Sequence, residues 1–321
     1  MTVHAPNQNE PLPGWGAQAT LAPSSHNTQP WLFRLGARSI DLFADRTRAL
    51  PVNDPFDREL LISCGAALGA LRVAVAGAGQ GMEVSLLPDD SDPDWLARVT
   101  LSSGAPDAAL ASLATLLASR HTRRHAFLPR EVAPDVRRAV AAAVSLEGAG
   151  LVDVDAAQRE SVAELVAEGD RLQWSDPSWR RELAMWMHPR RRGDGLAVPA
   201  LAAPIAQAVI RRFDMGRGVA AKDAELAAAS PWLSVIATHE DTPLAWIQAG
   251  QALQRALLTG CAGGLQASYL NQPIEVASLR PRLQALLEIQ GFPQLLLRWG
   301  YPERPLQAAP RRPLSDVIEG G

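Results

Sequence analysis

Two long apolar helices dominate the hydrophobic pattern of the chain, and they carry the same start and stop signals. The first begins at residues 54–55, where an aspartate suits the N-cap and a proline the first helical position. It runs through an alanine-rich stretch and ends in glycines at 77, 79 and 81. The second begins at 241–243 (Asp-Thr-Pro) and breaks at 263–264 (Gly-Gly). An extended stretch follows each helix, at 82–87 and 265–270.

Gly65 and Gly250 occupy matching places within these two helices, each followed by small residues. A helix face without bulky side chains lets a second helix approach closely. The pattern therefore predicts a weak internal repeat, in which the two helices cross at the centre of the molecule.

Shorter helical and extended patterns fill the rest of the chain. We expect further strands at 98–102, 151–154 and 294–299, and helices at 106–119, 134–144, 156–174 and 281–289. No regular strand–helix–strand alternation is present, so the fold class indicated is α+β. The repeat divides the chain into a first half at 1–104 and a second half at 105–321.

Between residues 175 and 229 the periodicity loosens, and tryptophan, methionine, arginine and glycine become frequent. A segment this long between core elements is usually functional or mobile. Two interpretations are open: a lid over a ligand, or a helical insertion on the surface that its tryptophans hold down.

The composition narrows the class of protein. With 321 residues, 47% hydrophobic and 20% charged, the chain is typical of a soluble globular protein with an ample core. A net charge of −3 gives no reason to expect a nucleic-acid partner. Arginine supplies almost every positive charge, because Lys222 is the only lysine.

A few local features of the sequence indicate in which compartment the protein occurs and whether it contacts a membrane. Cys64 and Cys261 lie far apart in apolar helical patterns, which predicts buried thiols and neither a redox pair nor a zinc site. No signal peptide is visible at 1–13. The stretch 61–79 is apolar enough to resemble a short membrane span, but Arg72 interrupts it and its alanines and glycines suit a core helix. We expect a cytoplasmic protein without membrane contact.

One decapeptide, 22–31 (Ala-Pro-Ser-Ser-His-Asn-Thr-Gln-Pro-Trp), concentrates hydrogen-bonding side chains beside an indole. Its two prolines predict a loop that leaves a helix. Hydroxyls, an imidazole and amides suit the heteroatom edge of a flat ligand, although most such clusters are simply polar turns. A second cluster, Arg-His-Thr-Arg-Arg at 120–124, is by itself typical of a solvated basic turn. His121 and His125 are four apart, but without nearby carboxylates or thiols they do not predict a metal site.

The order Pro-Ser-Ser-x-Asn-x-Gln-Pro-Trp resembles the flavin-ring loop of the nitroreductase superfamily of FMN proteins. Together with Ser-Cys-Gly-Ala-Ala at 63–67 and the basic cluster at 120–124, it is similar to the Acg family within that superfamily. The resemblance extends from about residue 17 to about residue 318.

The resemblance implies a binding site for FMN. For the flavin ring it implies contacts from one loop: Pro23, Ser24, Ser25, Asn27 and Gln29. For the phosphate it implies Arg120, Thr122 and Arg124, with a terminal basic residue from the pair Arg311 and Arg312, of which Arg312 is favoured. The stretch 269–273 corresponds to the region near flavin N5, which implies contacts from Leu270 and Gln272.

The two clusters are complementary, because the ring loop occurs only in the first half and the phosphate residues only in the second. Typical nitroreductases are homodimers, so the resemblance implies a fused pseudo-dimer that acts as a monomer and binds one FMN per chain. The implied activity is hydride transfer from NAD(P)H to the flavin and then to a nitro or quinone-like acceptor. An alternative is a flavoprotein that sequesters FMN under the lid with little turnover.

Overall fold

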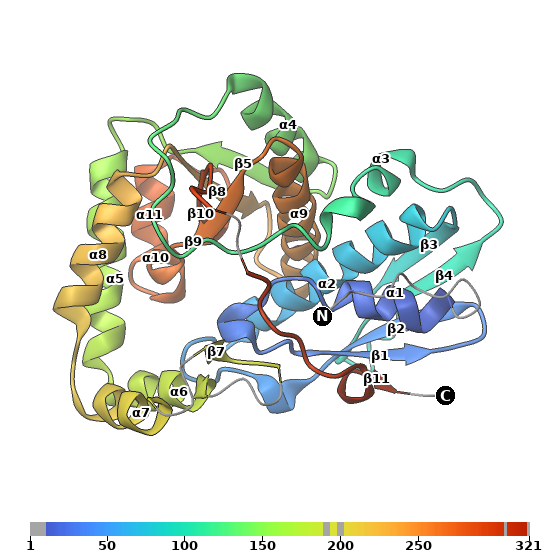
Figure 1. Ribbon diagram of the computed structural model, residues 1–321, viewed down its shortest axis with the longest axis horizontal. Coiled ribbons are helices and arrows are strands. Elements are labelled where there is room, and N and C mark those ends of the chain that lie inside the picture. Colours follow the sequence, from blue (N-terminus) through green and yellow to red (C-terminus); the bar gives the residue numbers. More distant parts are fainter. Residues whose placement is uncertain (1–10, 189–192, 198–201, 305–306, 320–321) are drawn as a thin grey trace.

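The computed structural model describes residues 11–188, 193–197, 202–304 and 307–319. Two separate sheets form its frame, with helices packed between and around them (Figure 1). The combination of helices with mostly antiparallel sheets confirms the α+β class.

The first sheet has the strand order β11-β1-β2-β4-β3. Its strands are β1 (Trp31–Leu35), β2 (Ser39–Ala44), β3 (Gly81–Leu86), β4 (Trp95–Ser102) and β11 (Ile318–Glu319). Helices α1 (Pro11–Ala19) and α2 (Arg58–Gly77) pack against each other. The C-terminal β11 runs parallel to β1, with Phe33 opposite Ile318, so the chain returns at its end to the first sheet.

The second sheet has the order β5-β8-β10-β9 and is antiparallel throughout. Its strands are β5 (Gly150–Asp153), β8 (Trp232–Thr238), β9 (Gln266–Tyr269) and β10 (Phe292–Gly300). One apolar cluster joins this sheet to α4 (Pro134–Ser145) and α9 (Pro243–Ala262). A different cluster joins it to α5 (Arg159–Ser175), α8 (Gly216–Ala228) and α11 (Arg280–Leu286). Helices therefore cover both faces of this sheet.

Helices α2 and α9 cross at their glycines, as the repeat predicts. A Cβ atom on Gly65 would lie 2.2 Å from the carbonyl oxygen of Ile247, and one on Gly250 would lie 2.1 Å from that of Ile62. Each glycine thus meets the carbonyl three residues before the other, a reciprocal contact. Helix α2 is long and apolar enough to cross a membrane, but 89% of its apolar stretch is buried inside the molecule, as in a core helix.

We expect Gly250→Ala to lower the free energy of unfolding by about 3 kcal/mol, because the added methyl forces two packed backbones apart. Thermal and urea unfolding measure the effect. Gly218→Ala is the control, since a Cβ there meets nothing within 4 Å and alanine favours a helix by about 1 kcal/mol over glycine. Equal stability of the two variants would contradict the close crossing.

The segment 175–229 contains α6 (Pro177–Trp186), β6 (Met187–His188), β7 (Leu196–Ala197), α7 (Ala203–Arg212) and α8. Helices α5 and α8 lie side by side at one edge of the molecule (Figure 1). Glu182 of α6 accepts hydrogen bonds from the backbone N–H groups of Val52 and Asn53 at 2.9 and 2.8 Å. Asp194 pairs with Arg48. These contacts join the segment to the first half of the chain.

Most predicted elements are confirmed, namely the two central helices, α4, α5 and strands β3, β4, β5, β9 and β10. The helix predicted at 106–119 is wrong: the structure has only α3 (Ala108–Ala111) and a 3-10 turn (Ala114–Leu116). Helix α11 ends at Leu286 rather than 289, and Glu288 just beyond it has a φ of 51°.

The start of the first central helix also differs from the prediction. Helix α2 begins at Arg58 after Asp57, whose φ is 57°, while Asp54 accepts a hydrogen bond from the N–H of Leu60 at 2.9 Å. Helix α9 begins as predicted at 241–243, with Thr242 as its N-cap and Pro243 as its first residue. The cysteines are free, and Cys64 is buried as expected, whereas Cys261 is only partly buried.

Candidate functional site

A cavity of about 550 Å³ lies between the two halves and is lined by residues of both. Every predicted site residue except Gln29 and Arg312 lines it. The ring loop and the start of α2 form one side, and the segment 120–124, strand β9 and α10 (Gln272–Glu275) form another. Helices α5 and α8 complete the wall. The structure thus brings together clusters that are about a hundred residues apart in sequence.

The ring loop has a strained backbone. His26, Asn27 and Gln29 have φ values of 49°, 55° and 53°, a region that side chains other than glycine rarely adopt. The hydroxyl of Ser24 holds the loop by accepting the N–H of Gln29 at 2.9 Å. Burial lowers the pKa of His26 to about 4, so its imidazole is neutral at pH 7. Such strain clusters at functional sites, where the surrounding structure enforces it.

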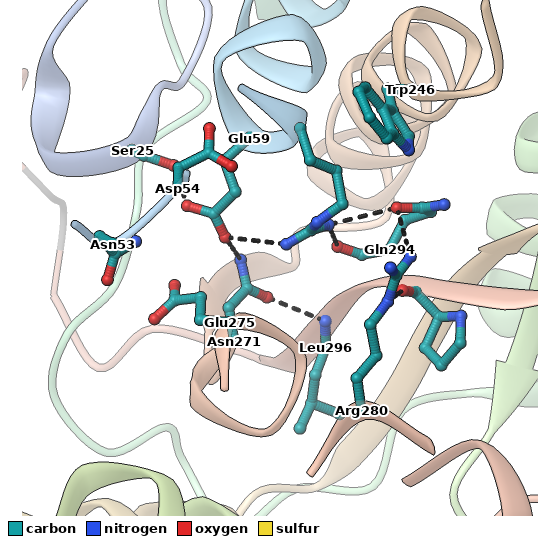
Figure 2. Close-up of polar contacts among 12 residues, drawn as sticks. Ser25, Asn53, Asp54, Glu59, Trp246, Asn271, Glu275, Arg280, Gln294 and Leu296 are labelled. Atoms are coloured by element: carbon teal, nitrogen blue, oxygen red, sulfur yellow. Dashed lines mark hydrogen bonds and ion pairs between the residues drawn. The ribbon is translucent and has the colours of Figure 1, made fainter. Parts of the chain in front are cut away.

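A polar network that includes cavity-lining residues joins the two halves (Figure 2). Ser25 donates its hydroxyl to Glu59 of α2 at 2.7 Å. Asn271 donates to the same carboxylate at 3.5 Å and accepts the N–H of Leu296 at 3.0 Å. Burial and the nearby charge of Glu59 raise the pKa of Glu275 well above its usual value. The loop is therefore anchored through Glu59 to the second sheet.

Gln29 and Arg312 have structural positions outside the cavity, contrary to the contacts that the resemblance implies. Gln29 is fully buried; its amide donates to the carbonyl of Gly193 at 2.8 Å and accepts the N–H of Arg312 at 2.9 Å. The guanidinium of Arg312 donates to the carbonyls of Gln29 and Asp316 at 2.9 and 2.6 Å. Arg311, the less favoured of the pair, lines the cavity instead.

Gln29 is expected to act as a structural clamp. Gln29→Ala should lower the free energy of unfolding by about 3 kcal/mol, because Gly193 and Arg312 each lose a buried hydrogen bond. Urea unfolding of the variant beside Gln290→Ala, a change at an exposed glutamine, measures this. A loss no larger than that of the control would refute the clamp.

The basic cluster lines one end of the cavity in an extended conformation. Arg120, His121, Thr122 and Arg124 line it, whereas Arg123 turns away and donates to the carbonyl of Ala126. The segment is fixed by a bridge from Thr122 to Ala267 and by the N–H of Arg123, which donates to the carbonyl of Ala267 at 2.9 Å.

Two buried polar atoms at this end lack partners within the described part of the chain. They are Nε of Arg120, whose side chain is 5% exposed, and the hydroxyl of Tyr269. Burial lowers the pKa of Arg120 and raises that of Tyr269 to about 12. Buried polar groups normally find hydrogen-bond partners, so this donor set suits an anionic ligand group such as a phosphate.

The stretch 269–273 does not make all the contacts that the family resemblance implies. Leu270 lines the cavity, but its N–H donates to the carbonyl of Leu296 at 3.0 Å, so it is not available to a flavin. The side-chain amide of Gln272 donates to Asp170 at 3.2 Å and to Asp223 at 3.0 Å. Gln272 is thus part of an acidic wall.

Sequence reasoning missed this wall. Asp170, Gln173 and Trp174 of α5 line the cavity, together with Val219, Lys222, Asp223 and Leu226 of α8. The spacing of each set is that of one helix face. The sequence does show polar residues on otherwise apolar helix faces, which can indicate a site. It does not show which cavity those faces line. No group of three or more metal-binding side chains occurs among the described residues.

Comparison with known proteins places the chain. No protein-family model matches it. A Mycobacterium tuberculosis protein named "Putative NAD(P)H nitroreductase Rv3131" is 34% identical over 310 residues, which cover 94% of this chain and 89% of the relative. The chain belongs to the nitroreductase superfamily. Within the superfamily it is similar to the "Putative NAD(P)H nitroreductase acg" of the same organism, with 30% identity over 314 residues, 94% of this chain and 92% of the relative.

Solved nitroreductase structures overlap this chain only loosely. The FMN-dependent nitroreductase NfnB of Mycobacterium smegmatis, solved with NADPH, gives a TM-score of 0.43 at 19% identity, covering 65% of this chain and 98% of that one. The NADPH:FMN oxidoreductase of Vibrio harveyi, solved with NAD+, gives 0.42 at 12% identity, covering 64% and 76%. Membership of the nitroreductase superfamily therefore rests on the sequence relatives.

Proposed function

We propose that this nitroreductase-superfamily protein is an FMN-dependent NAD(P)H oxidoreductase with one FMN per chain. The observation that carries the proposal is the cavity between the halves, which joins the ring loop of one half to the arginines of the other. The relatives named as nitroreductases support the same activity. Bound FMN supplies hydride chemistry, from NAD(P)H to flavin N5 and from there to a nitro or quinone-like acceptor.

The phosphate of FMN fits the basic end of the cavity. Arg120 and Tyr269 offer buried donors that lack partners in the described chain, and Thr122, Arg124 and Arg311 line the same cavity. Charge-assisted hydrogen bonds from guanidinium groups are the usual way to hold a phosphate. By holding the phosphate, these residues would position the flavin ring beside the ring loop.

The ring would lie against the strained loop, where Pro23, Ser24, Ser25 and Asn27 line the cavity. The hydroxyl of Ser25 is oriented by Glu59, and Asn27 donates to the carbonyl of Gly195 at 3.4 Å. A preorganised loop orients a bound ring without reorganisation and excludes water from one side of it. We also propose that the chain acts as a monomer, because both central helices are buried within one chain. The cytoplasmic location expected from the sequence stays part of the proposal.

The alternative of FMN sequestration is favoured by one set of contacts. The segment around Gly193–Gly195 is hydrogen-bonded to Asn27 and Gln29, and Trp179, Leu196 and Val219 of the predicted lid line the cavity. A lid tied to the ring loop in this way would hold a flavin in place while restricting access to it.

An absorbance experiment separates these functions. The protein is loaded with FMN, desalted and mixed anaerobically with NADPH or NADH. A reductase retains the flavin peaks and then bleaches them, with recovery when a nitroaromatic acceptor is added. Retained peaks that do not bleach with either nucleotide would replace the reductase by the sequestering flavoprotein.

A further inference from the structure

The wall that α5, α8 and α10 turn toward the cavity combines carboxylates with aromatic rings. Asp170 and Trp174 are one helical turn apart on α5, and Asp223 lies opposite on α8. Trp174 and Trp179 meet edge to face with their ring centroids 5.5 Å apart. Aromatic faces beside a carboxylate attract organic cations through both the charge and the ring quadrupoles.

Hydrogen bonds and helix packing hold the carboxylates of this wall in place. The amide nitrogen of Gln272 bridges them, at 3.2 Å from Asp170 and 3.0 Å from Asp223. A Cβ on Gly169 would lie 2.7 Å from that of Gln272, so this glycine allows α10 to come close enough for the bridge. The geometry therefore depends on packing and not on a flexible surface loop.

One oxygen of this arrangement has no partner. Asp170 is 3% exposed; its Oδ1 accepts from Gln272, while its Oδ2 has no hydrogen-bond partner among the described residues. A buried carboxylate oxygen without a donor is costly, and a ligand that supplies a donor removes that cost.

The basic side chains around the wall do not pair with these carboxylates. Arg298 donates to the carbonyls of Arg123 and His125 at 2.8 and 3.1 Å, and Arg171 and Lys222 are exposed. Burial raises the pKa of Asp223, and the charges of Arg298 and Lys222, which also line the cavity, act to lower it without forming an ion pair with it. Within the described chain no ion pair includes Asp170 or Asp223. The neighbouring Glu275 accepts a hydrogen bond from Gln173 at 2.5 Å, but its raised pKa favours the neutral carboxyl, so the negative charge of the wall comes from Asp170 and Asp223.

We propose that this wall is the acceptor subsite and that it selects flat aromatic acceptors carrying a protonated amine. The amine donates to Oδ2 of Asp170, and the ring lies against Trp174 and Trp179. This substrate class rests on the proposed reductase function, whose cofactor lies at the other end of the same cavity.

The test compares three acceptors of nearly equal size: 4-nitrobenzylamine, 4-nitrobenzyl alcohol and 4-nitrophenylacetate. The FMN-loaded enzyme should use the amine with a kcat/KM at least about tenfold above that of the alcohol, mainly through KM, and should use the anion least. In Asp170→Asn the ratio of amine to alcohol should fall to about one. In Glu164→Gln, an exposed carboxylate on the same helix, the ratio should stay as in the wild type. Equal use of all three acceptors by the wild type would overturn the proposal, as would an unchanged ratio in Asp170→Asn.

A binding measurement keeps this proposal separate from the reductase function. Titration calorimetry of the FMN-loaded protein with benzylamine and with benzyl alcohol should show about tenfold tighter binding of the amine, and Asp170→Asn should abolish that difference. Preferential amine binding without reduction of any nitro compound would sustain the subsite and reject the reductase. Reduction of all three acceptors without any amine preference, in kinetics or in binding, would reject the subsite and leave the reductase standing.

Discussion

Arg120→Met is expected to weaken FMN binding about 100-fold, since one charge-assisted hydrogen bond to a phosphate contributes about 1.5–3 kcal/mol. The same change should leave the free energy of unfolding of the FMN-free protein equal or slightly higher. The reason is that burial lowers the pKa of Arg120 and its Nε has no partner in the described structure, which offsets the loss of the hydrogen bond from its Nη2 to the carbonyl of Leu21 at 3.0 Å. Replacing a buried charge by an apolar side chain of similar volume is often neutral or stabilising.

The measurements are FMN fluorescence titration and urea unfolding of the same preparations. Arg123→Met is the matched control, because its guanidinium donates to the carbonyl of Ala126 and does not line the cavity. We expect wild-type affinity for that variant. If Arg120→Met bound FMN as tightly as the control does, the phosphate would not lie at the basic end.

Asp170→Asn should stabilise the FMN-free protein more at high pH than at low pH. Burial, followed by the charge of Asp223, raises the pKa of Asp170 from 3.8 to about 7. A group whose pKa is raised on folding stabilises the protein fully only below its unfolded pKa, and this contribution is lost as the pH rises through the folded pKa. For Asp170 the loss falls between about pH 4 and pH 7, and the shift corresponds to at most about 4 kcal/mol.

Asparagine removes this titration and keeps an oxygen that can accept from Gln272. The difference in unfolding free energy between Asp170→Asn and the wild type should therefore grow between pH 4 and pH 7.5. Urea unfolding at several pH values gives that difference directly, and contributions from titrating groups that do not interact with Asp170 cancel in it. For Glu164→Gln the difference should be flat. A flat difference for Asp170→Asn as well would show that this carboxyl titrates normally.

Much of the fold could be predicted because its central elements obey strong local rules. Helices α2 and α9 carry start signals, apolar faces and terminal glycines, and the matched positions of Gly65 and Gly250 predicted their crossing. Local rules failed where tertiary contacts decide the outcome. The segment 106–119 has a helical composition, yet only four residues of it form α3. Asp54 resembles an N-cap, but the left-handed backbone of Asp57 moves the start of the helix.

The candidate site likewise has one part that local sequence motifs predicted and another part that depends on tertiary contacts. The ring loop and the arginine cluster are contiguous in sequence, so their motifs located most of the cavity lining. Gln29 belongs to that motif but is used to clamp Gly193 and Arg312. The acidic wall was not predictable, because Asp170 and Asp223 come from separate helices and meet only through Gln272.

The central claim is that one chain builds one FMN site from its two halves. The most direct test is a titration of the purified protein with FMN, followed by flavin fluorescence or calorimetry and referred to the molar concentration of chains. Saturation is expected at one FMN per chain, with about 100-fold weaker binding at that single site in Arg120→Met. Saturation at two FMN per chain, or at one FMN per two chains, would contradict it.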